Sequence, residues 1–113
     1  MLVSVLIPLY NEEEFIGELL SGVLNAPLPA GTALEIVIVD DCSTDDSASI
    51  ARSFADRYPD RIRLFQHTSN RGKGAAVRTA VRHAEGEIGI IQDADLEYNP
   101  DEYPHLLKPI LED

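Results

Sequence analysis

Four short apolar stretches recur along the chain, and amphipathic segments separate them. The stretches are rich in β-branched residues and carry no periodic polar face, which is typical of interior strands in a parallel sheet covered on both sides. The third stretch begins with charged residues, so we expect it at an edge of the sheet. The predicted strands are residues 2–7, 34–39, 61–66 and 88–91.

The segments between these strands repeat apolar residues at helical spacing. Asn11, with Glu14 three residues later, predicts a helix N-cap and a capping box. We expect Ser43 or Thr44 to cap the second helix. Gly86 is expected to follow the last turn of the third helix as its C′ residue.

This alternation of strands and helices predicts an α/β fold with right-handed crossovers. The strand order 3-2-1-4 would give a Rossmann-like half of a mainly parallel sheet, flanked by helices. Its switch point lies between the first and fourth strands. Residues 8–12 and 93–95 would then lie side by side, with residues 40–41 one strand away. Three loops that are distant in sequence are therefore expected to meet at one crevice.

The fourth predicted strand ends in a cluster of carboxylates. Asp93 and Asp95 point to the same side of an extended chain, and Glu97 joins them if the extension continues. At about 4 Å each like-charged pair repels by roughly 4 kcal/mol, which predicts a cation between them. Oxygen ligands favour a hard ion, Mg²⁺ or Mn²⁺. D-x-D alone is a weak motif, and a surface turn is the alternative, but the end of a buried strand favours a binding site.

A nucleotide in that crevice would need separate contacts for its base, ribose and diphosphate. We expect Asp41, or its neighbour Asp40, to accept a hydrogen bond from a base N–H. Glu12, or main chain near Leu9, is expected to contact the base or the ribose. The alternative for the two aspartates is to cap the turn and the helix after it, and the alternative for Glu12 is the helix N-terminus.

Residues 70–74 form a glycine-bearing loop in which Arg71 and Lys73 are candidates to neutralise phosphate, because glycine lets backbone N–H groups approach closely. A solvated helix start is the alternative for Lys73. The loop is not a P-loop, because Gly74 and Ala75 follow the lysine. No G-x-G-x-x-G follows the first strand, so a dinucleotide cofactor is not expected.

The 113 residues suffice for one domain with a real core, and no apolar stretch approaches the ~18 residues that cross a bilayer. The first ten residues lack the basic region and cleavage site of a signal peptide. Cys42 is the single cysteine, which excludes an internal disulfide and fits a reducing, cytoplasmic location. His67, His83 and His105 form no metal-ligand set, and we expect each at the surface or at a helix cap.

The net charge of −11 argues against a nucleic-acid-binding protein, which would show a basic face. A phosphate-bearing partner would then need a metal bridge or a local basic cluster. Eight of the nine lysine and arginine residues lie between Arg52 and Arg82, and they supply such a cluster.

Four blocks of sequence occur in the order and spacing of a known family. The blocks are PLYNE at 8–12, VDDCSTD at 39–45, NRGKGA at 70–75 and QDADLEY at 92–98. They span almost the whole chain, and through them it resembles the family 2 glycosyltransferases with the GT-A fold. The DADLEY segment, with PHLL at 104–107, most resembles the dolichyl- or polyprenyl-phosphate sugar synthases.

The resemblance implies transfer of a sugar from a UDP- or GDP-linked donor, with a divalent metal. In the subgroup that it resembles, the acceptor is a polyprenyl phosphate at the cytoplasmic face of a membrane. The resemblance also implies that Asp41 holds the base and that Asp95 is the principal metal ligand and the catalytic residue. The other residues that it implies are Asp93 and Glu97 at the metal, and Pro8, Tyr10 and Glu12 in the nucleotide pocket.

Catalytic domains of this family are usually much longer, and an acceptor-side half normally follows the D-x-D segment. We therefore expect residues 1–113 to be a single domain, the N-terminal, nucleotide-sugar-binding part of a catalytic domain. A nucleotide-binding fragment that performs no transfer is the first alternative. The edge of the fourth strand would be exposed without neighbouring strands, which predicts self-association.

Two other classes fit the sequence less well. A signalling receiver domain has an acidic pair after a strand and a lysine near its end, as in Asp40-Asp41 and Lys108. The spacing does not fit, because Asp93 and Lys108 are only 15 positions apart, too few for another strand-helix-strand passage, and the acidic pair follows the second strand. A sugar-phosphate nucleotidyltransferase would carry arginine and lysine in a glycine-rich first loop. Residues 9–14 contain none of these.

Overall fold

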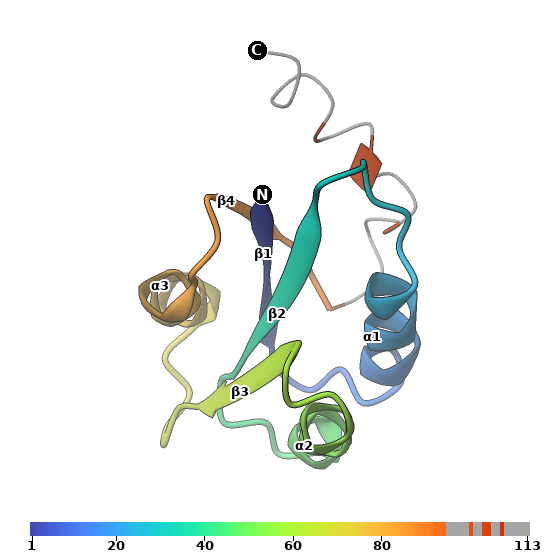
Figure 1. Ribbon diagram of the computed structural model, residues 1–113. Helices are drawn as coiled ribbons and strands as arrows, with labels where there is room; N and C mark the ends of the chain where they lie inside the picture. Colours follow the sequence, from blue (N-terminus) through green and yellow to red (C-terminus); the bar gives the residue numbers. More distant parts are fainter. Residues whose placement is uncertain (95–99, 101–102, 105–106, 108–113) are drawn as a thin grey trace.

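The computed structural model describes residues 1–94, 100, 103, 104 and 107. Its centre is a sheet of four parallel strands in the order β3-β2-β1-β4 (Figure 1). The strands are β1 (Leu2–Leu9), β2 (Ala33–Asp40), β3 (Ile62–Gln66) and β4 (Ile88–Ile91). The predicted strand order and the edge position of the third strand are confirmed.

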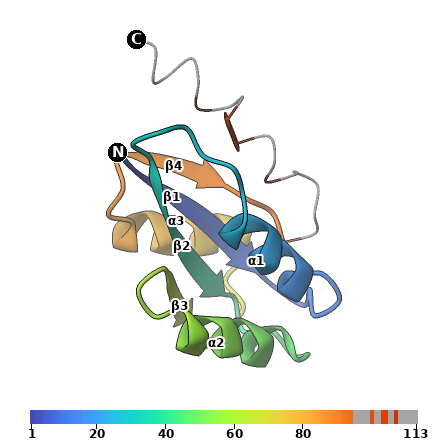
Figure 2. The ribbon, with the colours of Figure 1, turned by 45° about the vertical axis from the view of Figure 1, so that its right-hand side comes forward.

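Helices cover both faces of this sheet. They are α1 (Ile16–Leu24), α2 (Ser47–Arg57) and α3 (Lys73–His83). Figures 1 and 2 show α1 and α2 on one face of the sheet and α3 on the other. Each helix links one strand to the next, as parallel pairing requires.

Successive residues on the inner strands point alternately into two apolar cores. Val5 and Ile7 of β1, with Ile36 of β2, belong to the larger core beneath α1 and α2. Leu6 and Val37 belong to the smaller core beneath α3. All five side chains are almost completely buried. Burial of each contributes roughly 1.5–3 kcal/mol to folding.

The smaller core receives alanines from the helix side. Ala76 and Ala80 of α3 are buried against the sheet. Because their side chains are short, the helix backbone can pack close to the strands. The start of α3 is thereby held beside the carboxyl ends of β1 and β2.

The first helix does not begin where the sequence predicts. α1 begins at Ile16 with Phe15 at its N-cap and no side-chain cap, so the predicted cap at Asn11 is wrong. Asn11 has a φ of 50°, and its Oδ1 accepts a hydrogen bond from the Thr44 N–H (2.8 Å). The carboxamide therefore binds the loop after β2 instead of its own helix.

The predicted cap of the second helix is also wrong, because α2 begins at Ser47 without a side-chain cap from Ser43 or Thr44. Ser43 Oγ instead accepts from the Asn11 N–H (3.0 Å) and donates to Asp40 Oδ1 (2.6 Å). Residues with a local preference for caps thus join two loops that are distant in sequence.

Gly86 is not the C′ residue of α3. The C-cap of that helix is Ala84, and Gly86 is not among the residues with a positive φ. A Cβ atom on Gly86 would lie 2.5 Å from Ser4 Oγ and 2.8 Å from the Leu2 carbonyl oxygen. Glycine is required here because β1 passes too close for any side chain.

The helices of the described part of the chain are short. α2 and α3 have 11 residues each, whereas a membrane-spanning helix needs about 20. Among the described residues, no helix has the length and apolar character to cross a bilayer.

Candidate functional site

A cavity of about 510 Å³ lies at the carboxyl ends of β1, β2 and β4. Ligands of open parallel sheets bind at this end of the strands, and the volume lies in the usual range of small-molecule sites. The loops after all three strands contribute to its wall, so the expected meeting of these loops is confirmed. The residues that line it are Pro8, Leu9, Tyr10, Glu12, Asp41, Asn70, Gly72, Lys73, Ala76, Asp93 and Ala94.

The cavity brings together most of the residues that the sequence predicts for the site. Those at its wall are Pro8, Leu9, Tyr10, Glu12, Asp41, Lys73 and Asp93. Asp40 is not among the lining residues. Asp95 and Glu97 lie outside the described residues.

The end of β1 and the loop after it form one wall. Pro8 and Leu9 are buried at the end of the strand, whereas Tyr10 is 44% exposed. The Glu12 N–H donates to Ser47 Oγ (2.8 Å), and the Glu12 carbonyl accepts from the first N–H of α1 (2.9 Å). These bonds to two helices hold the Glu12 backbone at the cavity.

Asp40 has a structural role in this region. It is 2% exposed, and its Oδ1 and Oδ2 accept from the Ser43 hydroxyl (2.6 Å) and the Ser43 N–H (3.3 Å). The carboxylate therefore closes the turn after β2. Of the two candidates for a contact with the base, the geometry favours Asp41.

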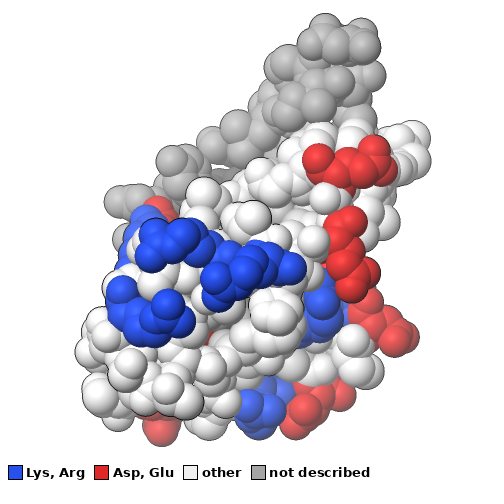
Figure 3. Space-filling view, turned by 90° about the vertical axis from the view of Figure 1, so that its left-hand side faces the viewer, with Lys and Arg blue, Asp and Glu red and all other residues white. Residues whose placement is uncertain are grey.

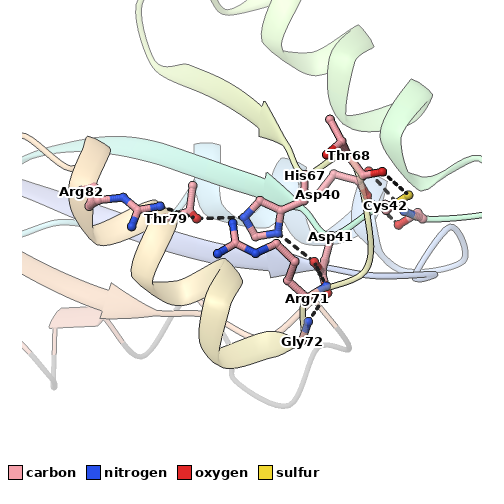
Figure 4. A network of polar contacts seen from close by, with 10 residues as sticks. Asp40, Asp41, Cys42, His67, Thr68, Arg71, Gly72, Thr79 and Arg82 are labelled. Carbon is pink, nitrogen blue, oxygen red and sulfur yellow. Dashed lines mark hydrogen bonds and ion pairs between the residues drawn. The ribbon is translucent and has the colours of Figure 1, made fainter.

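Asp41 directly follows β2 and its side chain accepts three hydrogen bonds. Oδ1 accepts from the Arg71 N–H (2.9 Å) and from His67 Nδ1 (2.8 Å), and Oδ2 accepts from the Gly72 N–H (2.8 Å) (Figure 4). Burial alone would raise the pKa of Asp41, but these bonds outweigh it and hold the pKa below its usual value. Asp41 is therefore ionised at neutral pH.

The backbone near the cavity adopts conformations that few side chains favour. Asn11 has a φ of 50°, Cys42 a φ of 63° and Gly72 a φ of 94°. The first two directly follow the lining residues Tyr10 and Asp41. A positive φ at a non-glycine residue costs of order 1–3 kcal/mol, and such strain gathers at functional sites.

Lys73, the first residue of α3, forms an ion pair with Asp93 beyond the end of β4. The two side chains are 61% and 20% exposed. Among the described residues, no group of three or more potential ligands could hold a metal ion, and Asp93 is the one predicted metal ligand that the structure describes. Its carboxylate is a hard oxygen donor that already faces a cation, which fits Mg²⁺ or Mn²⁺.

The residue before Asp93 anchors the end of β4. Gln92 is fully buried, and its backbone N–H donates to the Leu6 carbonyl (2.9 Å). Its Oε1 accepts from the hydroxyl of the buried Tyr103 (2.8 Å), and burial raises the pKa of that phenol. Gln92 thus fixes the point at which the chain leaves the sheet towards the D-x-D segment.

Basic side chains of α3 gather on one face of the molecule, whereas Arg52 and Arg57 of the predicted cluster belong to α2 on the other face of the sheet. Figure 3 shows lysine and arginine side chains grouped on the side that α3 covers. Lys73, Arg78 and Arg82 of this helix are exposed, and no aspartate or glutamate occurs between residues 70 and 84. The cavity lies at the start of this helix. A phosphate-bearing ligand would meet positive charge there, despite the net charge of −11.

His67 is the residue of this region that the sequence analysis missed. We expected it at the surface or at a helix cap, but its side chain is 6% exposed and joins Asp41 to Thr79 Oγ1 (2.8 Å). One signal was available. His67 directly follows β3, so it lies at the same edge of the sheet as Asp41.

The model of the family described as "Glycosyl transferase family 2" matches residues 4–113, which is nearly the whole chain. The chain belongs to this family.

Two curated relatives of this family 2 chain carry a polyprenyl phosphate in their names. The undecaprenyl-phosphate 4-deoxy-4-formamido-L-arabinose transferase of Edwardsiella ictaluri is 40% identical over 106 residues, which are 94% of this chain and 33% of the relative. The dolichol-phosphate mannosyltransferase of Pyrococcus furiosus is 37% identical over 110 residues, which are 97% and 30%. The chain thus spans about a third of the length of these relatives.

Solved structures confirm the GT-A fold of this family 2 chain. The mannosyltransferase PcManGT from Pyrobaculum calidifontis, solved with GDP-Man and Mn²⁺, has a TM-score of 0.74 at 44% identity, over 82% of this chain and 27% of that one. Residues 1–349 of S. aureus TarS, solved with UDP, have a TM-score of 0.76 at 31% identity, over 98% and 31%.

Proposed function

We propose that this chain forms the donor-nucleotide site of a glycosyltransferase that transfers a sugar from a UDP- or GDP-linked donor to a polyprenyl phosphate. The observation that carries the proposal is the cavity at the strand ends, whose wall includes Asp41, Lys73 and Asp93. These side chains supply an acceptor for a base N–H, a cation for phosphate and a carboxylate for a metal ion. The names of the curated relatives support the acceptor class.

Asp41 is the residue that we assign to the base. It is ionised, held by three donors and present at the cavity wall. Tyr10 and Glu12 lie at the same wall and are assigned to the base and ribose, together with the main chain near Pro8 and Leu9.

The diphosphate would lie between the start of α3 and the end of β4. Lys73 offers its ammonium group there, and Asp93 offers a metal ligand. We assign Asp95 as the principal metal ligand and catalytic residue, with Glu97 beside it, from their positions in the D-x-D-x-E segment. The Mn²⁺ in the PcManGT complex supports a divalent cation. When bound, such an ion stabilises negative charge on the departing diphosphate.

The proposed acceptor does not require a general base among the described residues. A polyprenyl phosphate is already an anion, so its attack on the anomeric carbon hardly needs a general base. The described residues would hold the donor, and Lys73 would neutralise charge that develops on the leaving diphosphate. A lipid-linked acceptor places the reaction at a membrane surface, and we propose the cytoplasmic face.

A second candidate function is nucleotide binding without transfer. The residues assigned at the cavity all serve the donor, and binding alone needs no others. Sugar transfer by the chain, as opposed to binding of the donor, would distinguish the two.

We also propose that the edge of β4, where Ile91 is 48% exposed, supports self-association. A single monomeric species in sizing experiments would contradict that proposal.

The proposed function is tested by calorimetric titration of UDP and GDP into the chain, with and without Mn²⁺. We expect Mn²⁺ to tighten binding of the preferred nucleotide, and Asp93→Asn and Asp95→Asn to remove that effect. Asp56→Asn is the matched control, because Asp56 is an exposed residue of α2 and its substitution changes the net charge equally. Binding that ignores Mn²⁺ in every variant would contradict the metal assignment. A folded chain that binds neither nucleotide would contradict the donor site.

A further inference from the structure

A series of hydrogen bonds runs from α3 to the wall of the cavity (Figure 4). Arg82 Nη2 lies 3.1 Å from Thr79 Oγ1, which lies 2.8 Å from His67 Nε2. The other ring nitrogen, His67 Nδ1, lies 2.8 Å from Asp41 Oδ1. Thr79 is buried, and the His67 and Asp41 side chains are only 6% and 4% exposed. Polar groups buried to this extent depend on their protein partners.

The chemistry of the two ends sets the direction of each bond. A guanidinium only donates, so Thr79 accepts from Arg82. An ionised carboxylate only accepts, so His67 Nδ1 carries a proton and donates it to Asp41. Within the part of the chain that the structure describes, the Thr79 hydroxyl has no acceptor for its proton other than His67 Nε2. With the Thr79 proton directed at Nε2, His67 would accept from Thr79 and donate to Asp41, which corresponds to the neutral Nδ1–H tautomer.

A protonated imidazole would disrupt this arrangement. The Nε2–H of His67 and the guanidinium of Arg82 would both point at the Thr79 oxygen, and the hydroxyl proton would lose its acceptor. A buried donor without a partner is costly. The exposed Arg82 would repel an imidazolium, whereas Asp41 at 2.8 Å would attract it, so the directions of the hydrogen bonds decide between the two states.

We infer that Thr79 and Arg82 are positioning residues that hold His67 neutral, and that His67 in turn holds Asp41 as a full anion that is oriented towards the donor base. The inference rests on the proposed function, because it assigns how the same cavity recognises a base. A neutral imidazole donates to Asp41 without cancelling its charge, whereas an imidazolium would form an ion pair with it. The backbone donors of residues 71–72 also leave that charge intact.

An anionic acceptor at the cavity wall distinguishes between bases. Uracil and guanine present a ring N–H that donates to a carboxylate. Cytosine presents an unprotonated ring nitrogen at the equivalent position, and its lone pair repels a carboxylate. A fixed buried carboxylate disfavours a base that offers it no N–H, because its remaining lone pair then meets a lone pair of the base instead of a donor. The series from Arg82 to Asp41 therefore favours UDP or GDP over CDP.

The first test is imidazole ¹⁵N NMR of His67 in the ligand-free chain at neutral pH. Substituting both other histidines, His83→Gln with His105→Gln, leaves His67 as the single histidine and assigns its signals. We expect the shift of a protonated nitrogen at Nδ1 and that of an unprotonated nitrogen at Nε2. A proton on Nε2 would overturn the inference, whatever the chain binds.

The second test compares Thr79→Val, which removes the hydroxyl at nearly constant volume, with Thr79→Ser, which keeps it. Thr79→Val should change the Nε2 shift and weaken UDP or GDP, whichever binds better, by about threefold to tenfold. The affinity for CDP should stay unchanged, and Thr79→Ser should behave like the wild type. An equal loss for CDP, or no loss, would overturn the inference.

Two further outcomes are decisive. If Thr79→Val does not fold, Arg82→Met replaces it, because Arg82 is exposed and donates to Thr79. Arg82→Met should also lower the preference for UDP or GDP over CDP. An unchanged preference in that variant would count against the inference. If the wild type binds no nucleoside diphosphate, the proposed function fails and the role of Asp41 fails with it. The NMR result still reports the state of His67 in that case.

Discussion

Two carboxylates, one near each end of the inner strand β2, hold the two ends of α3. Glu35, near the start of β2, accepts from the N–H groups of Glu85 (2.6 Å) and Gly86 (3.2 Å), which follow the helix. Asp41, directly after β2, accepts from the N–H groups of the 71–72 segment, which precedes the helix. The two residues thus have the same structural task at opposite ends of the sheet.

The two carboxylates differ in the way their charge is compensated. Glu35 Oε1 accepts from Arg63 Nη2 (2.7 Å), and Glu35 Oε2 accepts from Ser4 Oγ (2.5 Å). Among the described residues, no arginine side chain binds Asp41; the His67 ring and two backbone amides bind it instead. A negative charge therefore remains available at the cavity, whereas an arginine already matches the charge of Glu35.

Several features that are commonly taken as signs of function do not separate these residues. Both are buried, both have a lowered pKa, and Glu35 borders a depression of about 570 Å³ near the opposite end of the strands. The position relative to the strand ends and the identity of the counter-charge do separate them. The comparison predicts that substitutions at Asp41 affect ligand binding and that substitutions around Glu35 affect stability.

The largest expected effect is on nucleotide affinity in Asp41→Asn. We expect the affinity for the preferred nucleoside diphosphate to fall about 10-fold to 100-fold, because one charged hydrogen bond to the base is lost. Calorimetric titration measures this change. Asp56→Asn is the control of equal charge, and Glu35→Gln is the contrast, with wild-type affinity per folded molecule. A large affinity loss in Glu35→Gln would contradict the assignment of ligand binding to Asp41 and of stability to Glu35.

Gly86→Ala tests the stability side of the comparison. The new methyl group would meet Ser4 Oγ and two backbone atoms of β1 at 2.5–2.8 Å, so β1 or the 85–86 turn must move. We expect the free energy of unfolding to fall by about 1–3 kcal/mol in urea denaturation. Gly89→Ala on β4 is the control, since its Cβ would meet Leu6 Cδ1 at 3.4 Å, an ordinary contact. Equal losses in the two variants would contradict this account of Gly86.

Much of the fold could be predicted because it depends on properties that neighbouring residues share. Apolar runs without a polar face mark the buried strands, and parallel pairing then brings their carboxyl ends to one edge. The meeting of the loops after β1, β2 and β4 followed from that topology alone. The place of Asp41, Lys73 and Asp93 at the cavity wall could be predicted because each lies just beyond a strand or at the start of a helix.

The remaining features depend on contacts between residues far apart in sequence. Asn11 and Ser43 have the composition of helix caps, but they bind each other's loops across 32 residues. His67 has no local signature, because its partners Asp41 and Thr79 are 26 and 12 residues away. Gly86 is needed for its distance from β1, which only the folded chain reveals.

Acid titration provides a smaller test of the Glu35 network. Burial alone would raise the pKa of Glu35, but bonds from Ser4, the Glu85 N–H and Arg63 outweigh it and lower the pKa. A lowered pKa in the folded state contributes stability above the usual value of 4.5, and this stability is lost as the pH falls through the folded-state value.

Glu35→Gln should therefore cost about 1–2 kcal/mol at neutral pH and lose less stability than the wild type on further acidification. Urea denaturation at neutral pH and at two values below 4.5 measures both effects. Asp41 has a lowered pKa as well, so Glu35→Gln retains part of the acid dependence. An acid dependence identical to that of the wild type would contradict the assigned role of Glu35.

The smallest expected effect concerns Lys73. It is the cation paired with a carboxylate at the cavity, as Arg63 is the cation paired with Glu35. Arg63 has a side chain only 35% exposed and binds a buried carboxylate, whereas Lys73 is 61% exposed and faces Asp93. Because solvent screens an exposed charge, we expect Lys73→Gln to weaken the nucleoside diphosphate about twofold to fivefold and to leave stability nearly unchanged. Titration of the nucleoside diphosphate and of the bare nucleoside separates the phosphate contact from the base contact. Arg57→Gln controls for the lost positive charge, because Arg57 is exposed in the last turn of α2. A loss that is equal for the nucleoside would mean that Lys73 acts on the base side of the cavity and not on the phosphates.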